Sequence, residues 1–67
     1  EVIKLGSLVT TNKGSFFIAI SRGQITIDNK MYFAIAPNAP IGQLLLGKRA
    51  GDTFEFNGNN FSIQLVE

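Results

Sequence analysis

The residues most able to do chemistry in this sequence are its five carboxylates, since the chain contains neither histidine nor cysteine. Paired carboxylates can transfer protons or hold a metal ion. Without histidine and cysteine, however, thiol nucleophiles, Ser–His pairs, Cys–His pairs and the usual zinc ligand sets are excluded. The carboxylates are scattered over both ends of the chain, two turns and a strand: Glu1, Asp28, Asp52, Glu55 and Glu67. We therefore expect solvated carboxylates, no catalytic residue, no metal, no cofactor, and a protein that is not an enzyme.

Glycine and basic residues could bind phosphate, but their spacing does not favour it. Gly42, Gly47 and Gly51 fit neither the GxGxxG nor the GxxxxGK[ST] pattern. Six basic residues stand against five acidic ones, and only Lys48 and Arg49 are adjacent. A phosphate backbone is usually met by a clustered cationic surface. No strong direct nucleic-acid signal is therefore present.

The aromatic residues offer a second possible chemistry, because six phenylalanines and Tyr32 could stack on the bases of a single strand. Most of them alternate with polar residues, as core residues in strands do, so core packing is the favoured interpretation. Tyr32 and Phe33 are neighbours and must point to opposite faces. Only one of them can be fully buried if the sheet has a solvent side.

A rigid loop precedes the single expected helix. Pro37 and Pro40 bracket Asn38 and Ala39, which fixes the backbone and presents a protruding surface at low entropic cost. The candidate partner-binding residues are Pro37, Asn38, Ala39, Pro40 and Ile41. The same pattern is equally typical of a helix entry that has no partner.

The helix itself should lie in the stretch IAPNAPIGQLLLGKRAGDTFEF, residues 35–56, around which the chain is organised. We expect Asn38 to cap it, Pro40 to occupy its first turn and Gly47 to end it. An inward apolar stripe is expected from the helical spacing of three side chains, Ile41, Leu44 and Leu45.

Strands account for the rest of the chain, and their pattern is antiparallel. The expected strands are Val2–Thr10 (one bent strand), Ser15–Ile20 (central), Gln24–Ile27, Met31–Ile35, Thr53–Phe56 and Phe61–Val66. Arg22 and Gly23 should interrupt the strand pattern after the second strand. Asn57 and Gly58 give the strongest hairpin signal. Alternation places Ile20 with Phe16 and Ile18 on one face, and Leu65 with Phe61 and Ile63.

At 67 residues the chain has room for one domain, residues 1–67. The fold class is α+β: a twisted antiparallel sheet of about five to six short strands with one short helix packed on it. No apolar run reaches the roughly 20 residues that span a bilayer, so no membrane partner is expected. Because the sequence begins at Glu1 within an expected strand, we expect a fragment of a longer chain. Cysteine-free composition suits the cytoplasm.

The stretch IAPNAPIGQLLLGKRAGDTFEF, residues 35–56, resembles the C-terminal domain of the GreA/GreB transcript-cleavage (transcription elongation) factors. The resemblance rests on Pro40, Leu44 to Lys48, Gly51 and Asp52, and on the upstream KLGSLVTT, which is similar to the opening strand of that domain. Within this family, the sequence most resembles the small Gre-type proteins of Bacteroidetes. Alanine stands at position 39, where the family has serine.

The resemblance implies an FK506-binding-protein-like (FKBP-like) fold and, upstream, an N-terminal helical or coiled-coil region. It implies docking on RNA polymerase, at the rim of the secondary channel, through the loop before the helix. The acidic tip that stimulates RNA cleavage belongs to the coiled coil, which this chain does not include. Two alternatives remain: an FKBP-type domain that binds small ligands or prolyl peptides, and single-strand binding by the aromatic face. The oligomeric state is open.

Overall fold

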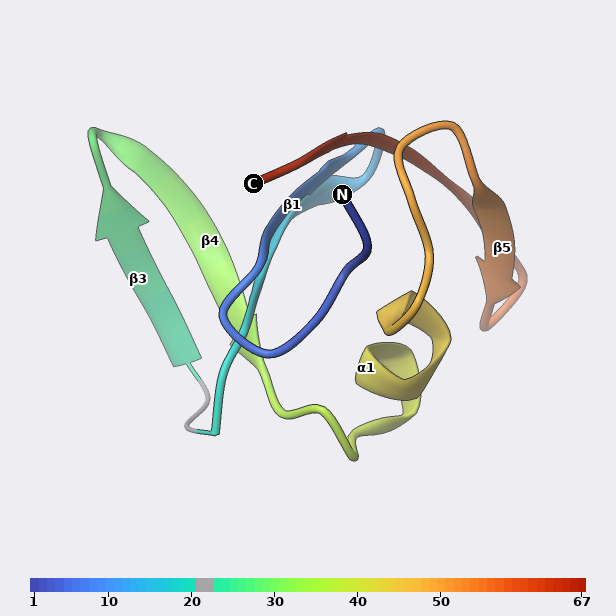
Figure 1. Cartoon of the computed structure of the whole chain (residues 1–67), viewed down its shortest axis with the longest axis horizontal. Helices are drawn as coiled ribbons and strands as arrows, with labels where there is room; N and C mark the ends of the chain where they lie inside the picture. The colour runs from blue at the N-terminus through green and yellow to red at the C-terminus, as the bar shows by residue number, and fades with distance from the viewer. Residues whose placement is uncertain (21–22) are drawn as a thin grey trace.

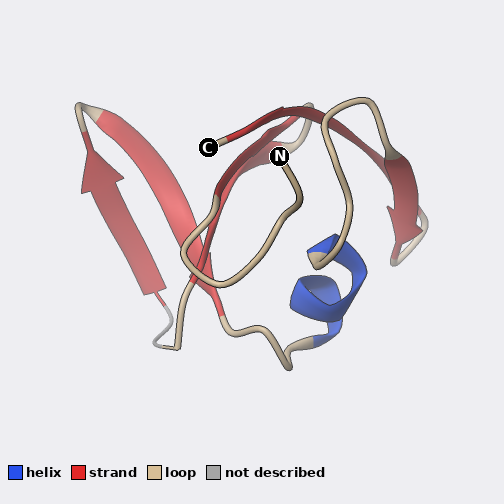
Figure 2. Cartoon of the chain, in the orientation of Figure 1, coloured by secondary structure: helices blue, strands red, loops and turns tan. Residues whose placement is uncertain are grey.

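Six strands and one helix follow one another along the chain in a computed structural model that describes residues 1–20 and 23–67 (Figure 1). The break expected at Arg22 lies outside the described residues. The elements are β1 (Leu8–Thr11), β2 (Gly14–Ile18), β3 (Gly23–Ile27), β4 (Lys30–Ile35), α1 (Pro40–Leu45), β5 (Thr53–Phe56) and β6 (Asn59–Val66). The expected α+β class, with one short helix on a sheet, is confirmed (Figure 2).

The sheet is mixed, so the expectation of a wholly antiparallel sheet is wrong. Its order is β3-β4-β2-β1-β6-β5, and β2 pairs with β4 in parallel, with Phe16 opposite Phe33. The cause is the path of the chain: after β2 it moves to the edge of the sheet as β3, and the hairpin return inserts β4 between β3 and β2. Each neighbouring pair in sequence is antiparallel, and only the inserted contact is parallel.

Two hairpins are closed by residues in the left-handed region of the backbone. Asn57 and Gly58 have φ values of 53° and 80°, and Asp28 and Asn29 have 52° and 64°. Positive φ at both central positions defines the type I′ turn, whose twist matches that of the paired strands. The sequence predictions of both hairpins are confirmed.

The first strand is shorter than expected, because residues 2–7 form an arm rather than a strand. Gly6 adopts φ 94°, which turns the chain, and the Ser7 Oγ accepts a hydrogen bond of 2.9 Å from the Lys4 N–H. The arm crosses to the segment after the helix: the Ile3 N–H donates to the Lys48 carbonyl at 2.8 Å, and the Gly47 N–H donates to the Ile3 carbonyl at 2.9 Å. Ile3 thereby joins the core.

The core lies between the helix and one face of the curved sheet (Figure 1). Leu45 is fully buried there, and Ile41 packs against the core as expected. Leu46 packs against the core in place of the expected Leu44, because the chain leaves the helical conformation at Leu46, with φ −56° and ψ 134°. The buried members of the core are Ile3, Val9, Phe16, Ile18, Leu45, Phe61, Ile63 and Val66. Gly47, with φ 83°, follows the C-cap as expected.

Two predicted core residues are exposed. Ile20 is 86% exposed because β2 ends at Ile18. Leu65 is 45% exposed because the pairing of β1 with β6 shifts between Thr10, opposite Leu65, and Thr11, opposite Ile63. This bulge reverses the alternation, so Val66 is buried in place of Leu65.

Candidate functional site

The loop before α1 is a hydrogen-bonded turn, which we call the entry turn (residues 36–40). The Ala39 N–H donates to the Ala36 carbonyl at 3.0 Å, so Pro37 occupies the second position of a four-residue turn, where its fixed φ is favourable. The Asn38 carbonyl then accepts a hydrogen bond of 3.1 Å from the Gln43 Nε2. The turn is therefore held both by its own backbone and by the helix.

The helix starts one residue later than expected. Its N-cap is Ala39, which is in an extended conformation and makes no side-chain hydrogen bond. Pro40 follows as the first residue of the helix. The prediction that Asn38 caps the helix is wrong, because Asn38 lies inside the entry turn, one residue before the N-cap. A cap side chain must accept from an N–H of the first helical turn, and alanine has no group that can.

Gly42 fixes the distance between the helix and the entry turn. A Cβ at this position would overlap the Ala36 carbonyl oxygen and would lie 3.2 Å from the Pro37 carbonyl oxygen. Both obstacles are backbone atoms, which cannot rotate away as a side chain can. The helix can approach the turn this closely only because residue 42 has no side chain.

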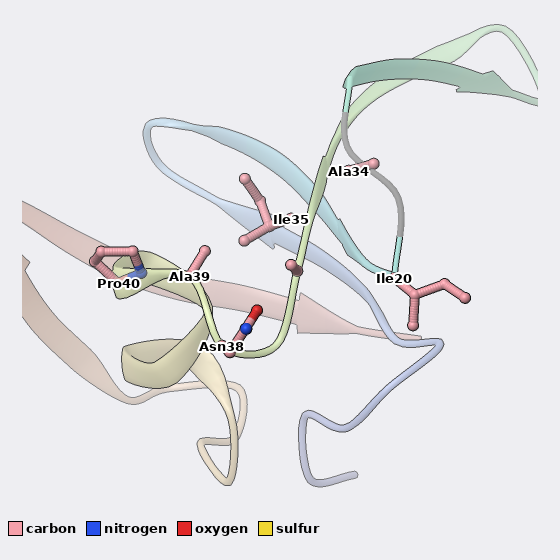
Figure 3. Close-up of a pocket in the computed structure, with 7 residues that line it drawn as sticks. Ile20, Ala34, Ile35, Asn38, Ala39 and Pro40 are labelled. Carbon is pink, nitrogen blue, oxygen red and sulfur yellow. The ribbon is translucent and has the colours of Figure 1, made fainter.

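A hollow of about 640 Å³ lies beside the entry turn and receives side chains from three segments (Figure 3). Its described lining consists of Ile20, Ala34, Ile35, Ala36, Asn38, Ala39 and Pro40. Only one of these side chains, that of Asn38, carries a hydrogen-bonding group, and none is ionisable. Such a surface can accept an apolar side chain or a peptide backbone, but it offers no acid, base or nucleophile.

The structure divides the five candidate residues. Asn38, Ala39 and Pro40 line the hollow, and Asn38 and Pro40 are exposed. Pro37 is half-buried within the turn, whereas Ile41 packs against the core and belongs to the scaffold. The residue that sequence reasoning missed is Ile20. Its exposure could have been suspected only from its place at the end of a strand, beside a turn.

The carboxylates occupy turns, a strand and the two ends of the chain. The Asp52 Oδ2 accepts a hydrogen bond of 2.9 Å from the Arg49 N–H, which closes the turn after the helix; Asp28 sits at a hairpin tip, and Glu55 is exposed on β5. Among the described residues, no group of three or more potential metal-binding side chains gathers. Nor do the described residues include a helix with the length and apolarity that crossing a bilayer requires.

The aromatic side chains mainly form the core. Phe61 contacts Phe16 and Phe54, with ring centroids 6.3 Å and 4.9 Å away, and the Phe54 and Phe61 rings are stacked. Tyr32 is 4% exposed and Phe33 is 40% exposed, which confirms that only one of these neighbours is fully buried. Phe33 rests near Phe16, at 6.3 Å between centroids. A stacking platform for bases would need several exposed rings in a row, and the described phenylalanines are mostly covered.

Comparisons with models of known protein families, with curated proteins and with solved structures found no match.

Proposed function

We propose that this domain is a protein-docking module that contacts its partner through the entry turn, and that the partner is RNA polymerase. The observation that carries the docking role is the combination of a hydrogen-bonded turn with exposed residues beside an uncharged hollow. Prolines on both sides leave the turn little freedom to lose on binding. Exposed side chains there are Asn38 and Pro40, with Ile20 across the hollow.

Ile20 gives the surface a central apolar contact. An aliphatic side chain that is 86% exposed loses much of its contact with water on docking. Interface energy is usually concentrated in a few such anchors, surrounded by contacts that exclude water. In this proposal Ile20 and Pro40 are the anchors, and the Asn38 amide supplies a directional hydrogen bond.

The identity of the partner rests on the sequence resemblance. Pro40, the LLGK run and the Gly51–Asp52 pair are similar to the polymerase-docking domain of GreA/GreB factors, and an FKBP-like arrangement of sheet and helix would follow from the same relationship. The domain would then bind at the secondary-channel rim, in the cytoplasm, as one part of a longer factor. It would contribute binding and no catalysis, because the entry turn and its hollow carry no ionisable side chain among their described residues.

Co-purification with RNA polymerase core enzyme tests this proposal. The informative variant is Pro40→Asp, since aspartate in the first turn of a helix is favourable to the helix and therefore leaves the fold intact, while it places a charge in an apolar contact. We expect the parent to be retained and the variant to lose binding by about tenfold or more.

The matched control is Asn59→Asp, which adds the same charge on the β5–β6 hairpin, at an exposed position. It should bind as the parent does. No retention of the parent would contradict the choice of polymerase, whereas equal retention of the parent and Pro40→Asp would contradict the choice of the entry turn.

A further inference from the structure

Strand β3 forms one edge of the sheet, and its outer backbone groups have no partner within the described sheet. The two-residue turn at Asp28 and Asn29 pairs Ile27 with Lys30 and Ile25 with Tyr32. In such a hairpin the pair next to the turn is hydrogen-bonded, and hydrogen-bonded pairs then alternate along the ladder. Gly23, Ile25 and Ile27 thus direct their N–H and C=O groups toward β4. The groups of Gln24 and Thr26 point away from the sheet.

This edge carries none of the devices that usually prevent strands from joining. Such devices are charged side chains, prolines, bulges and very short strands. The sequence of β3 is GQITI, five residues without charge or proline, and its register with β4 is regular. The opposite edge, β5, differs because Glu55 lies within the strand, whereas the nearest described charge to β3, Asp28, lies in the turn beyond it. Two β5 edges brought together would place two Glu55 carboxylates on one short ladder.

We infer that β3 is a self-association edge, on which β3 of a second copy of this chain adds in antiparallel register about a two-fold axis at Ile25. The hydrogen-bonding pattern selects this register. The outward groups are those of Gln24 and Thr26. Only the register that sets Gln24 of one copy opposite Thr26 of the other lets both residues of each copy pair within the strand, and it places Ile25 opposite Ile25 between them. Gly23 then lies opposite Ile27.

The side chains agree with this arrangement. Ile25 and Ile27 are half-buried and share their face with Tyr32, which is 4% exposed. Pairing across the two-fold axis therefore extends an apolar strip rather than creating one. On the other face, exposed Gln24 and Thr26 form polar pairs without like charges in contact. In this dimer the two β3 edges are paired with each other, and the edges left unpaired are the two β5 strands, which carry charge. Assembly therefore stops at two copies.

Sedimentation velocity on the 67-residue chain tests the inference, from about 10 μM to about 1 mM, because a five-residue ladder makes a small interface of modest affinity. We expect a concentration-dependent conversion of monomer to dimer. Thr26→Pro removes one outward donor without touching the ladder to β4, and should lower the association constant by about tenfold or more. Thr53→Pro, at the start of the other edge, is the matched control and should associate as the parent does.

A pair of double variants tests the register. Gln24→Lys with Thr26→Lys sets lysine opposite lysine twice and should give monomer throughout the range. Gln24→Glu with Thr26→Lys sets opposite charges across the axis and should tighten the dimer, on the order of tenfold. A parent that stays monomeric near 1 mM would overturn the inference. So would larger oligomers, or a dimer that responds equally to the two double variants.

Discussion

The two hairpins at the ends of the sheet use the same local chemistry and reach different tertiary outcomes. Each has a two-residue turn with positive φ at both central positions. The β5–β6 hairpin buries Phe61, Ile63 and Val66 in the core. The β3–β4 hairpin buries Tyr32 and Ala34 but contributes no buried side chain to that core cluster, and it leaves Met31 and Phe33 53% and 40% exposed. Turn residues therefore determine that a hairpin forms, while the positions of its apolar residues determine whether it stabilises the domain or remains available for binding.

The largest test of this comparison is the removal of one aromatic side chain from each hairpin. Phe61→Ala empties a site that contacts two other rings and should cost about 3–5 kcal/mol of the free energy of unfolding. Phe33→Ala removes a ring that is 40% exposed and should cost about 1–2 kcal/mol. Urea unfolding measures both values. Equal losses would show that the β3–β4 hairpin is as much a part of the core as β5–β6.

A second test concerns the junction between the two hairpins, where α1 meets the entry turn. Gly42→Ala places a methyl group against the Ala36 carbonyl and should cost about 1–3 kcal/mol. Amide chemical shifts of Ala36, Asn38 and Ala39 should move, because the turn must retreat. Gly47→Ala serves as a control: it strains a residue with φ 83° in open space, so it should lower stability and leave those three signals in place.

A smaller effect is expected at the N-cap of α1. Ala39→Ser supplies the missing acceptor for an N–H of the first helical turn and should raise the free energy of unfolding by about 1 kcal/mol. For a domain of this size, the melting temperature should rise by about 4–8 °C. Ala39→Val, which cannot cap, should show no such gain. A neutral effect of serine would mean that water already satisfies these N–H groups.

The smallest expected effect comes from exchanging the turn residues of the two hairpins. Asn29→Gly relieves a non-glycine residue at φ 64° and should stabilise the domain by roughly 0.5–1 kcal/mol. Gly58→Asn is the reverse exchange and should destabilise it by a similar amount. Thermal unfolding of both variants measures the difference. Effects of the same sign would show that the two turns are not equivalent.

Local features of the fold could be predicted from the sequence, because their causes are local. The hairpin at Asn57 and Gly58 and the helix stop at Gly47 each depend on backbone conformations that few residues adopt. The parallel contact of β2 with β4 could not be predicted in this way, since it depends on where in the sheet the chain places β3 and β4 after it leaves β2. The bulge opposite Thr10 and Thr11 could not be predicted for a similar reason, because it belongs to a pairing between residues far apart in sequence.

The candidate site could likewise be predicted only in part. The two prolines indicated a fixed turn, and the turn is present. Its outer partner, Ile20, was assigned to the core by strict alternation, which fails where a strand ends. Asn38 was assigned to the helix cap by residue type alone, whereas the Ala36–Ala39 hydrogen bond places it inside the turn.

The pairing of β1 with β6 has a consequence for how the chain acquires its structure. Val9 pairs with Val66, and the Glu67 N–H donates to the Leu8 carbonyl at 2.7 Å. The strand beside β1 thus comes from nearly the whole length of the chain away, and closing so long a loop slows folding. During synthesis the β1–β2 and β3–β4 hairpins can form early, but β5 has no strand to pair with until β6 has left the ribosome. We expect the cooperativity of the nascent domain to depend on β6.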